Sequence, residues 1–170
     1  MKKILNKELI NQKIRNIGET ISKKFSGKNP IFISVLKGSF IFTADLLRSI
    51  KIDCEVEFIK VQSYKGTQST GNVKITSDIK MDLKGRHIII IEDIIDSGKT
   101  INHLFGEFKK KSAKSISIAT FLMKSNQQKF DFAIDYIGFE IKQGFVVGYG
   151  LDYNQKYRNL DSLYVLENEI

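Results

Sequence analysis

Two adjacent carboxylates and a short polar loop follow one another in the segment 88–100, which reads IIIIEDIIDSGKT. The four isoleucines 88–91 are typical of a strand buried on both faces of a parallel sheet, so Glu92 and Asp93 are expected where that strand ends. Carboxylate oxygens accept hydrogen bonds from vicinal hydroxyls and bind hard cations. The pair therefore predicts a site for hydroxyls or a cation, and the alternative is an ordinary solvated strand end.

The five residues that follow, 96–100 (DSGKT), form a loop of small polar residues that runs into a helical segment, 101–111. Small residues let backbone N–H groups converge on an anion at a helix N-terminus, which favours phosphate. The end of the loop resembles a P-loop, but that motif requires glycine where this chain has Asp93, so we reject it. A phosphate here and hydroxyls beside the two acids together describe a ribose 5-phosphate. The alternative is a plain turn with Asp96 as the helix N-cap.

The elements around this segment predict an α/β fold with a mainly parallel sheet, flanked by helices. In such a sheet, ligands bind outside the carboxyl ends of the strands, where the loop 96–100 falls. Apolar periodicity and turn residues indicate helices at 6–25, 40–50 and 101–111, and strands at 31–36, 54–61, 73–76, 88–91, 115–123, 136–141, 145–148 and 163–166.

Composition narrows the class of protein. The chain has 170 residues, a formal net charge of +8 and a single cysteine, Cys54, which cannot form an internal disulfide. It has no apolar run long enough to span a bilayer, so we expect a cytoplasmic protein without a membrane partner. The lysines are dispersed, and the run 109–111 is better explained as a solvated helix end than as a nucleic-acid site. A positive field also suits anionic substrates.

The segment 92–100 resembles the phosphoribosyl-pyrophosphate (PRPP) signature of the type I phosphoribosyltransferases, and is most similar to their hypoxanthine-guanine (6-oxopurine) branch. The resemblance extends from about residue 36 to about residue 160. It implies one domain, 1–170, with a core at about 28–135 and a small hood from about 1–27 and 136–170. It also implies a purine salvage enzyme that transfers the 5-phosphoribosyl group from PRPP to N9 of hypoxanthine or guanine, giving IMP or GMP and pyrophosphate. Mg²⁺ is the implied cofactor.

The same resemblance assigns roles at the PRPP end of the site. Glu92 and Asp93 would hold the ribose hydroxyls or a Mg²⁺ bound to them, and Asp96 would be the catalytic residue that exchanges a proton with N7 of the purine. The residues implied for the 5-phosphate are Asp96, Ser97, Gly98, Lys99 and Thr100.

The pyrophosphate end and the lid are also implied by resemblance. Lys37 and Gly38, often joined in the family by a non-proline cis peptide, would bind pyrophosphate together with Arg158. Ser63 and Tyr64 would belong to a lid that closes over the reacting centre and excludes water. Read without the family, these residues are a turn, a loop serine and surface side chains.

The base would be held from the C-terminal third of the chain. Lys124 would donate to the exocyclic O6, which selects 6-oxopurines and rejects adenine, because the 6-amino group of adenine is itself a donor. The residues implied for the purine are Lys124, Phe145, Val146, Leu151 and Asp152. Asp152 would also join Glu92 and Asp93 as a magnesium ligand. Without the resemblance, the apolar members of this set are core residues and Lys124 is a surface lysine.

Two rival functions remain at this stage. One is a phosphoribosyltransferase for another base, such as xanthine, adenine or uracil; Lys124 argues against adenine, and no residue ranks hypoxanthine, guanine and xanthine. The other is a regulator that keeps the PRPP fold but binds nucleic acid, against which the intact Asp96, Lys124 and Asp152 speak. The partners implied by resemblance are PRPP, a 6-oxopurine base and further copies of the chain, in a homodimer or homotetramer.

Overall fold

The computed structural model describes residues 1–63, 73–77, 79–124, 130, 132–142 and 144–166. Within these ranges it has three helices, α1 (Lys7–Lys24), α2 (Phe40–Ser49) and α3 (Lys99–Lys110). The strands are β1 (Lys2–Leu5), β2 (Ile31–Leu36), β3 (Glu55–Ser63), β4 (Val73–Ile75), β5 (His87–Ile95), β6 (Ser115–Lys124), β7 (Tyr136–Ile141), β8 (Phe145–Val147) and β9 (Leu163–Leu166). None of the helices in this part of the chain is long and apolar enough to cross a membrane.

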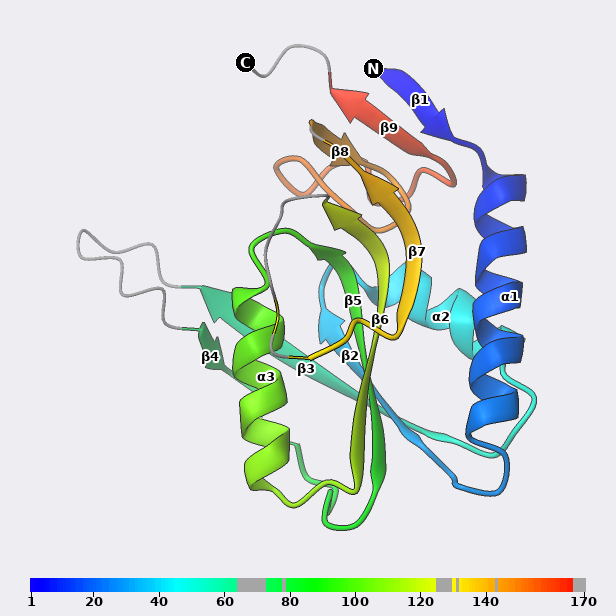
Figure 1. The fold of residues 1–170 in the computed structure, drawn as a ribbon. Helices are drawn as coiled ribbons and strands as arrows, with labels where there is room; N and C mark the ends of the chain where they lie inside the picture. The colour runs from blue at the N-terminus through cyan, green and yellow to red at the C-terminus, as the bar shows by residue number, and fades with distance from the viewer. Residues whose placement is uncertain (64–72, 78, 125–129, 131, 143, 167–170) are drawn as a thin grey trace.

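A six-stranded sheet forms the body of the molecule, in the order β4-β3-β2-β5-β6-β7. The strands β3, β2, β5, β6 and β7 pair in parallel, and β4 adds an antiparallel edge. Helices α1 and α2 cover one face and α3 the other (Figure 1). This arrangement confirms the predicted α/β fold with a mainly parallel sheet flanked by helices.

The isoleucine run of β5 serves both faces of this sheet. Side chains alternate along a strand, so Ile89 and Ile91 pack in the core under α1 and α2, whereas Ile88 and Ile90 pack in the core under α3. All four are fully buried, which is why the run shows no apolar–polar alternation.

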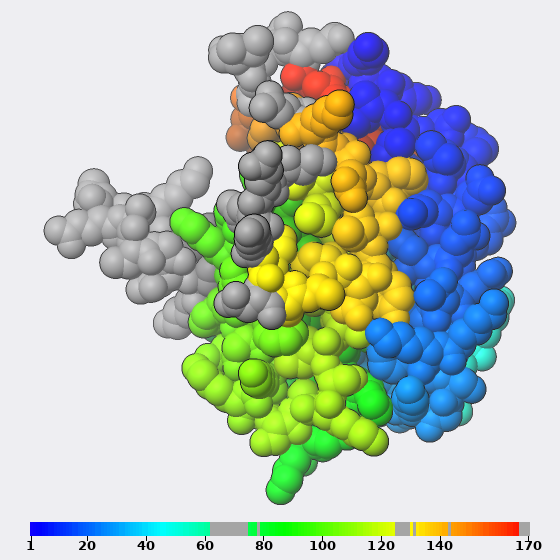
Figure 2. Space-filling model, in the orientation of Figure 1, coloured from blue at the N-terminus to red at the C-terminus, as the bar shows by residue number. Residues whose placement is uncertain are grey.

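A second, three-stranded sheet, in the order β1-β9-β8, lies at the end of the molecule that also holds the N-terminus (Figure 1). Its strands pair antiparallel, and Figure 2 shows β1 and β9 side by side there. Strand β1 was not predicted, because a four-residue segment whose partner lies at the other end of the chain has no local signal.

The border of the predicted hood needs correction. The segments 1–27 and 136–170 were expected to form it, but α1 packs against α2 and β7, and β7 pairs in parallel with β6 in the main sheet. The apolar face of α1, with Ile10, Ile14 and Ile21, belongs to the main core, which explains its position. The small sheet therefore takes β1, β8 and β9 from these segments.

The two acids also lie differently from the prediction. Strand β5 continues to Ile95, since its pairing with β6 extends to Ile95 opposite Met123. Glu92 and Asp93 therefore lie within the paired part of β5 rather than beyond the end of the strand. The helix that follows begins at Lys99, two residues earlier than expected.

Candidate active site

Two clefts meet at the carboxyl edge of the main sheet and share Ile94 and Asp96. The wider, of about 280 Å³, is lined by Asp93, Ile94, Asp96, Lys124, Gly144, Phe145, Val146, Leu151 and Asp152. The narrower, of about 110 Å³, is lined by Glu92, Ile94, Ile95, Asp96, Ser97, Gly98, Lys99, Thr100 and Ile101. The structure thus gathers the residues expected at the phosphate around one cleft and those expected at the purine around the other.

Glu92 and Asp93 are buried next to one another, and burying two neighbouring carboxyl groups costs the folded protein an unusual amount of free energy. Glu92 is only 9% exposed, and its Oε2 has no hydrogen-bond partner among the described residues. Burial and the neighbouring Asp93 carboxylate raise the pKa of Glu92 well above its usual range. Burial also raises the pKa of Asp93, although the Ile94 N–H, at 2.9 Å from Asp93 Oδ1, works against that rise. A buried acceptor without a partner is uncommon in folded proteins and marks Glu92 as a candidate functional residue.

The loop before α3 leaves a helix N-terminus open to an anion. Gly98 is the N-cap residue, with φ of +67°, and no side chain caps the first turn. This corrects the alternative in which Asp96 is the cap. Two features favour glycine at position 98. A Cβ there would lie 2.0 Å from the Phe130 ring, and the backbone has the left-handed conformation that glycine adopts readily. The first residues of α3, Lys99, Thr100 and Ile101, line the narrower cleft.

Asp96 and Lys124 form an ion pair at the mouth of the wider cleft. Lys124 Nζ donates to Asp96 Oδ2 at 3.0 Å, from the last residue of β6 to the residue just beyond β5. Parallel neighbours end at the same edge of a sheet, and this brings the two side chains together. The cleft therefore presents a donor, Lys124, beside an acceptor, Asp96. This pair matches a heterocyclic base whose edge carries an acceptor atom next to a donor atom.

The turn at Lys37 and Gly38 packs directly against the acids. A Cβ on Gly38 would lie 1.5 Å from Asp93 Oδ2, so only glycine fits there. Lys37 Nζ donates to Gln155 Oε1 at 3.2 Å. Among the described residues a cis peptide bond joins Leu36 to Lys37, one residue before the Lys37–Gly38 bond that is often cis in the family. The sequence left open whether that bond is cis.

The opposite wall comes from the segment after β8. Arg158 Nη1 donates to the Gly150 carbonyl at 2.7 Å, and its Nη2 lies 2.6 Å from Asp152 Oδ1. The second Asp152 oxygen accepts from the Gln155 N–H at 2.8 Å. These contacts hold the segment 150–158 in a compact turn with a guanidinium at its centre.

The apolar side chains of this wall differ in exposure. Val146 and Leu151 are buried, whereas Phe145 is exposed and meets Tyr153 edge-on, with ring centroids 5.5 Å apart. An exposed aromatic ring beside a charged cleft provides a stacking surface for a planar ligand. Ser63 is the last residue of β3, and Tyr64 lies outside the described residues.

The donor set fits a magnesium ion that arrives with substrate. The described residues contain no group of three or more His, Cys, Asp or Glu side chains that could hold a metal by themselves. Mg²⁺ is usually bound by one or two carboxylates together with substrate phosphates and water. The unpartnered Glu92 Oε2 and the adjacent Asp93 suit that role. Asp152 accepts from Arg158 and Gln155, one contact on each oxygen, and each oxygen keeps a further lone pair for a metal ion.

Sequence reasoning missed three side chains that shape the site. Gln155 accepts from Lys37, Phe130 covers Gly98, and Tyr149, between two glycines, donates to Asp45 on α2. The only sequence signal among them was the position of Tyr149 within Gly148-Tyr149-Gly150, since a bulky residue flanked by glycines often anchors a turn.

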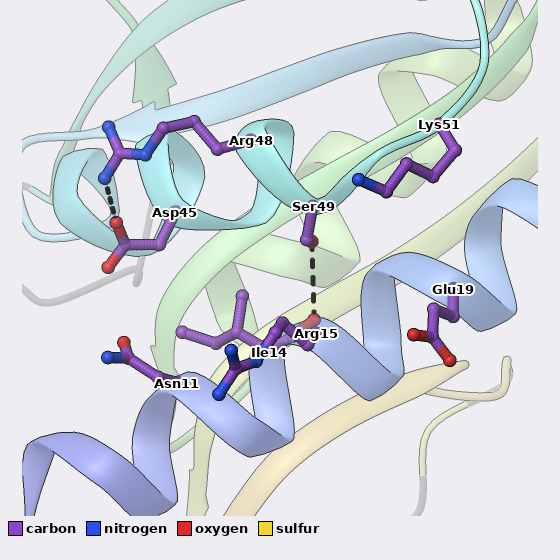
Figure 3. Close-up of a pocket in the computed structure, with 8 residues that line it drawn as sticks. All are labelled: Asn11, Ile14, Arg15, Glu19, Asp45, Arg48, Ser49 and Lys51. Carbon is purple, nitrogen blue, oxygen red and sulfur yellow. Dashed lines mark hydrogen bonds and ion pairs between the residues drawn. The ribbon is translucent and has the colours of Figure 1, made fainter.

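A larger cleft, of about 430 Å³, lies between α1 and α2 (Figure 3). It is lined by Asn11, Ile14, Arg15, Glu19, Asp45, Arg48, Ser49 and Lys51, none of which lines the other two clefts. The Ser49 hydroxyl donates to the Leu46 carbonyl of its own helix at 2.6 Å and lies 3.4 Å from the Ile14 carbonyl of α1, and Arg48 pairs with Asp45.

Comparison with known proteins gives a consistent family. The phosphoribosyl transferase domain family matches residues 1–154. The hypoxanthine-guanine phosphoribosyltransferase of Streptococcus pneumoniae is 42% identical over 172 residues, covering 100% of this chain and 96% of that protein. The Bacillus subtilis protein of the same name is 43% identical over 167 residues, covering 98% of this chain and 93% of that protein.

Solved structures agree with the sequence relatives. The crystal structure of a hypoxanthine-guanine phosphoribosyltransferase from Bacillus anthracis superimposes with a TM-score of 0.91 at 38% identity, covering 98% of both chains. A hypoxanthine phosphoribosyltransferase from Staphylococcus aureus gives a TM-score of 0.92 at 35% identity, covering 98% of this chain and 91% of that chain.

Proposed function

The chain belongs to the phosphoribosyl transferase family, and from that premise we propose that it is a purine salvage enzyme acting on hypoxanthine or guanine. It transfers the 5-phosphoribosyl group of PRPP to N9 of the base, giving IMP or GMP and pyrophosphate. The observation that carries this function is the pair of joined clefts, in which an open helix N-terminus, a buried acid pair and the Asp96–Lys124 pair follow one another.

PRPP occupies the narrower cleft and the floor of the wider one. Its 5-phosphate accepts from backbone N–H groups of the loop and of the start of α3 and from the Ser97 and Thr100 hydroxyls; the residues proposed for this contact are Asp96, Ser97, Gly98, Lys99 and Thr100. The ribose hydroxyls donate to Glu92 and Asp93, which satisfies the unpartnered Glu92 oxygen. Lys37, Gly38 and Arg158 bind the pyrophosphate, with the guanidinium as a planar donor.

The base enters the wider cleft with its polar edge towards β5 and β6. Lys124 donates to O6, and the N7–H donates to Asp96, the two groups that stand 3.0 Å apart in the structure. Phe145 stacks on one face of the ring, the Val146 backbone pairs with the purine edge, and Leu151 lies beneath the ring.

The transfer itself is positioning and electrostatics. As the bond from ribose C1 to pyrophosphate breaks, positive charge grows on the ribose, and the nearby carboxylates of Glu92, Asp93 and Asp96 stabilise it. N9 of the base then bonds to C1 while Asp96 takes the N7 proton. Ser63 and Tyr64 belong to a lid that keeps water from intercepting the ribosyl cation.

Mg²⁺ is the proposed cofactor, and Glu92, Asp93 and Asp152 are the residues that would hold it. When bound, the ion supplies positive charge that shields the leaving pyrophosphate. The support is the chemistry of the donors, three carboxylates at the edge of the cleft, one with an oxygen that accepts no hydrogen bond from any described residue.

The proposal includes self-association, as a homodimer or homotetramer. Its support is a set of large apolar side chains left exposed on α2 and β3, namely Phe40, Val56 and Phe58. Isolated exposed apolar residues are common, but three on elements that lie next to one another favour a covered surface. Sedimentation of the wild-type protein and of Phe58→Lys tests this part separately.

The deciding experiment measures pyrophosphate release from PRPP and Mg²⁺ with hypoxanthine, guanine, xanthine, adenine and uracil in parallel, for wild type and Asp96→Asn. Turnover with hypoxanthine or guanine that falls by about 10²-fold to 10⁴-fold in the variant is expected from loss of the acid/base group. A chelator arm, with Mg²⁺ restored afterwards, tests the cofactor. Absence of turnover with every base would falsify the function, and undiminished turnover in Asp96→Asn would remove that residue from its role.

A further inference from the structure

Three buried hydroxyls form a connected chain beneath the Lys37–Gly38 turn. Ser34 lies in β2, Ser39 precedes α2, and Thr43 lies in the first turn of α2; the side chains are all but inaccessible to solvent. Ser34 Oγ lies 2.8 Å from Ser39 Oγ and 2.8 Å from Thr43 Oγ1. Ser39 Oγ donates to the Val35 carbonyl at 2.6 Å. The chain thus links the strand before the turn to the helix after it.

Counting protons fixes the direction of this chain. A hydroxyl has one proton, and Ser39 gives its proton to the Val35 carbonyl, which can only accept. Ser34 must therefore donate to Ser39, and Thr43 must donate to Ser34. Every hydroxyl proton in the series Thr43, Ser34, Ser39 and Val35 has one acceptor, so the network is fully satisfied in a single arrangement.

The hydroxyl chain connects the two ends of the three-residue turn 36–38. Pairing of β2 with β5 ends at Ser34 opposite Ile91, so the segment beyond it is no longer held from that side. The Ser39 hydroxyl binds back to Val35 across residues 36–38, and the Thr43 N–H donates to the Ser39 carbonyl at 2.8 Å. On its other side β2 stays paired with β3 as far as Leu36, opposite Lys60, so the hydroxyl chain closes the turn on the side that β5 leaves unpaired.

We propose that Ser34, Ser39 and Thr43 are positioning residues that hold the Lys37–Gly38 turn in the shape that binds the pyrophosphate group of PRPP. The inference rests on the proposed function and extends it, because none of the three lines either cleft. A fully buried site could instead be filled with apolar side chains, which would pack without needing hydrogen bonds. Unlike apolar side chains, the three hydroxyls make directional hydrogen bonds. Such bonds fix the shape of the turn, which must hold Gly38 close against Asp93.

The test compares substrate dependences in variants that remove single members of the chain. Ser39→Ala removes the hydroxyl contact to the Val35 carbonyl, and Ser34→Ala breaks both hydroxyl contacts. Each is expected to raise KM for PRPP about tenfold, as the loss of one buried hydrogen bond implies. KM for hypoxanthine at saturating PRPP is expected to stay within about twofold, because the base cleft keeps its walls. Pyrophosphate should weaken as a product inhibitor in parallel with PRPP.

Thr43 gives a matched pair, and Ser22 gives a control. Thr43→Val removes the hydroxyl at constant volume and is expected to raise KM for PRPP about threefold, whereas Thr43→Ser keeps the donor and should behave as wild type. Ser22, on α1, is also buried, donates to the Gly18 carbonyl at 2.7 Å and accepts from the Lys51 N–H at 2.9 Å. Ser22→Ala should lower thermal stability without changing either KM.

Equal rises in both KM values, or lowered stability with an unchanged KM for PRPP, would show a structural role only and overturn the inference. If Ser34→Ala and Ser39→Ala fail to fold, the Thr43 pair decides, because identical KM values in Val and Ser variants contradict the proposed chain. Failure of the wild-type protein to use PRPP with any base is a different result, which rejects the proposed function itself.

Discussion

Two charged regions of the molecule differ in how their walls are built: the joined clefts at the carboxyl edge of the sheet, and the cleft between α1 and α2. The second is larger, about 430 Å³ against about 280 Å³ for the wider active-site cleft. Its charges stand on helix surfaces, and Arg48, for example, has a side chain that is 73% exposed. At the sheet edge, Glu92 is buried without a full set of partners. Desolvated, unsatisfied groups rather than volume or charge distinguish the functional region.

One residue of the α1–α2 cleft contacts the segment that forms the opposite wall of the active site. Asp45 lines the α1–α2 cleft, where it pairs with Arg48 (Figure 3). It also accepts from the Tyr149 hydroxyl. Tyr149 is buried against Phe121, with ring centroids 4.6 Å apart, and it directly precedes the turn that carries Leu151. Burial and Asp45 raise the pKa of Tyr149, so its hydroxyl remains a donor throughout the physiological range. The hydrogen bond between Tyr149 and Asp45 therefore connects the helix cleft to the segment that carries Leu151.

The largest expected effect comes from filling the contact between Gly38 and Asp93. In Gly38→Ala, the new Cβ would stand 1.5 Å from Asp93 Oδ2, so the turn or the acid must move. A displacement of that size is expected to lower kcat/KM for PRPP by about a hundredfold or more. Steady-state kinetics checks this. Gly106→Ala on α3, where a Cβ meets nothing within 4 Å, is the control and should keep its activity. Equal activity in the two variants would show that Gly38 is an ordinary turn residue.

The prediction for Gly38→Ala depends on the contact between Gly38 and Asp93. That contact could not be predicted from the sequence, although much of the fold could be. Strands β2, β7 and β9 have the predicted bounds because apolar runs and turn residues are local signals. Strand β1 lacks one, since it is defined by its pairing with β9. In the same way, topology brings Asp96 and Lys124 to one edge, but their 3.0 Å ion pair depends on side-chain rotamers. Contacts such as Lys37 with Gln155 join distant loops whose separation no motif encodes.

A second difference between the regions is energetic and depends on pH. The folded-state pKa of Glu92 is raised above its ordinary value of 4.5, so the folded protein binds that proton more tightly than the unfolded chain does. The stabilising contribution of this group is complete below the unfolded pKa and is lost as pH rises through the folded pKa. Glu92→Gln cannot ionise, so it should be more stable than wild type at pH 8.5, by about 1–3 kcal/mol, and this advantage should shrink towards pH 5.

Thermal unfolding of both proteins at pH 5 and pH 8.5, in buffer free of divalent cations, measures this difference. A gain of several degrees is expected at the higher pH for a domain of this size, at about 2–4 °C per kcal/mol. Glu19→Gln, which changes an exposed acid of the α1–α2 cleft, should leave the pH dependence as in wild type. A Glu92→Gln variant that is less stable than wild type at pH 8.5 would mean that the buried carboxylate is satisfied in solution.

The smallest expected effect separates two residues of the α1–α2 cleft itself. Asp45→Asn keeps the volume of the side chain but replaces the charged acceptor of Tyr149 and frees Arg48 from its partner. Loss of a charge-assisted contact is expected to loosen the 148–152 turn and raise KM for hypoxanthine about threefold to tenfold.

Arg15→Ala, on the facing helix, removes a cation that makes no contact with that turn and should change KM by less than about twofold, as surface substitutions do. Initial rates at varied hypoxanthine distinguish the two, and Tyr149→Phe, which removes the bond altogether, should raise KM at least as much as Asp45→Asn, whose uncharged amide oxygen is a weaker acceptor. If Arg15→Ala instead matched Asp45→Asn, the charge of the helix cleft as a whole, rather than the single hydrogen bond to Tyr149, would influence the base site.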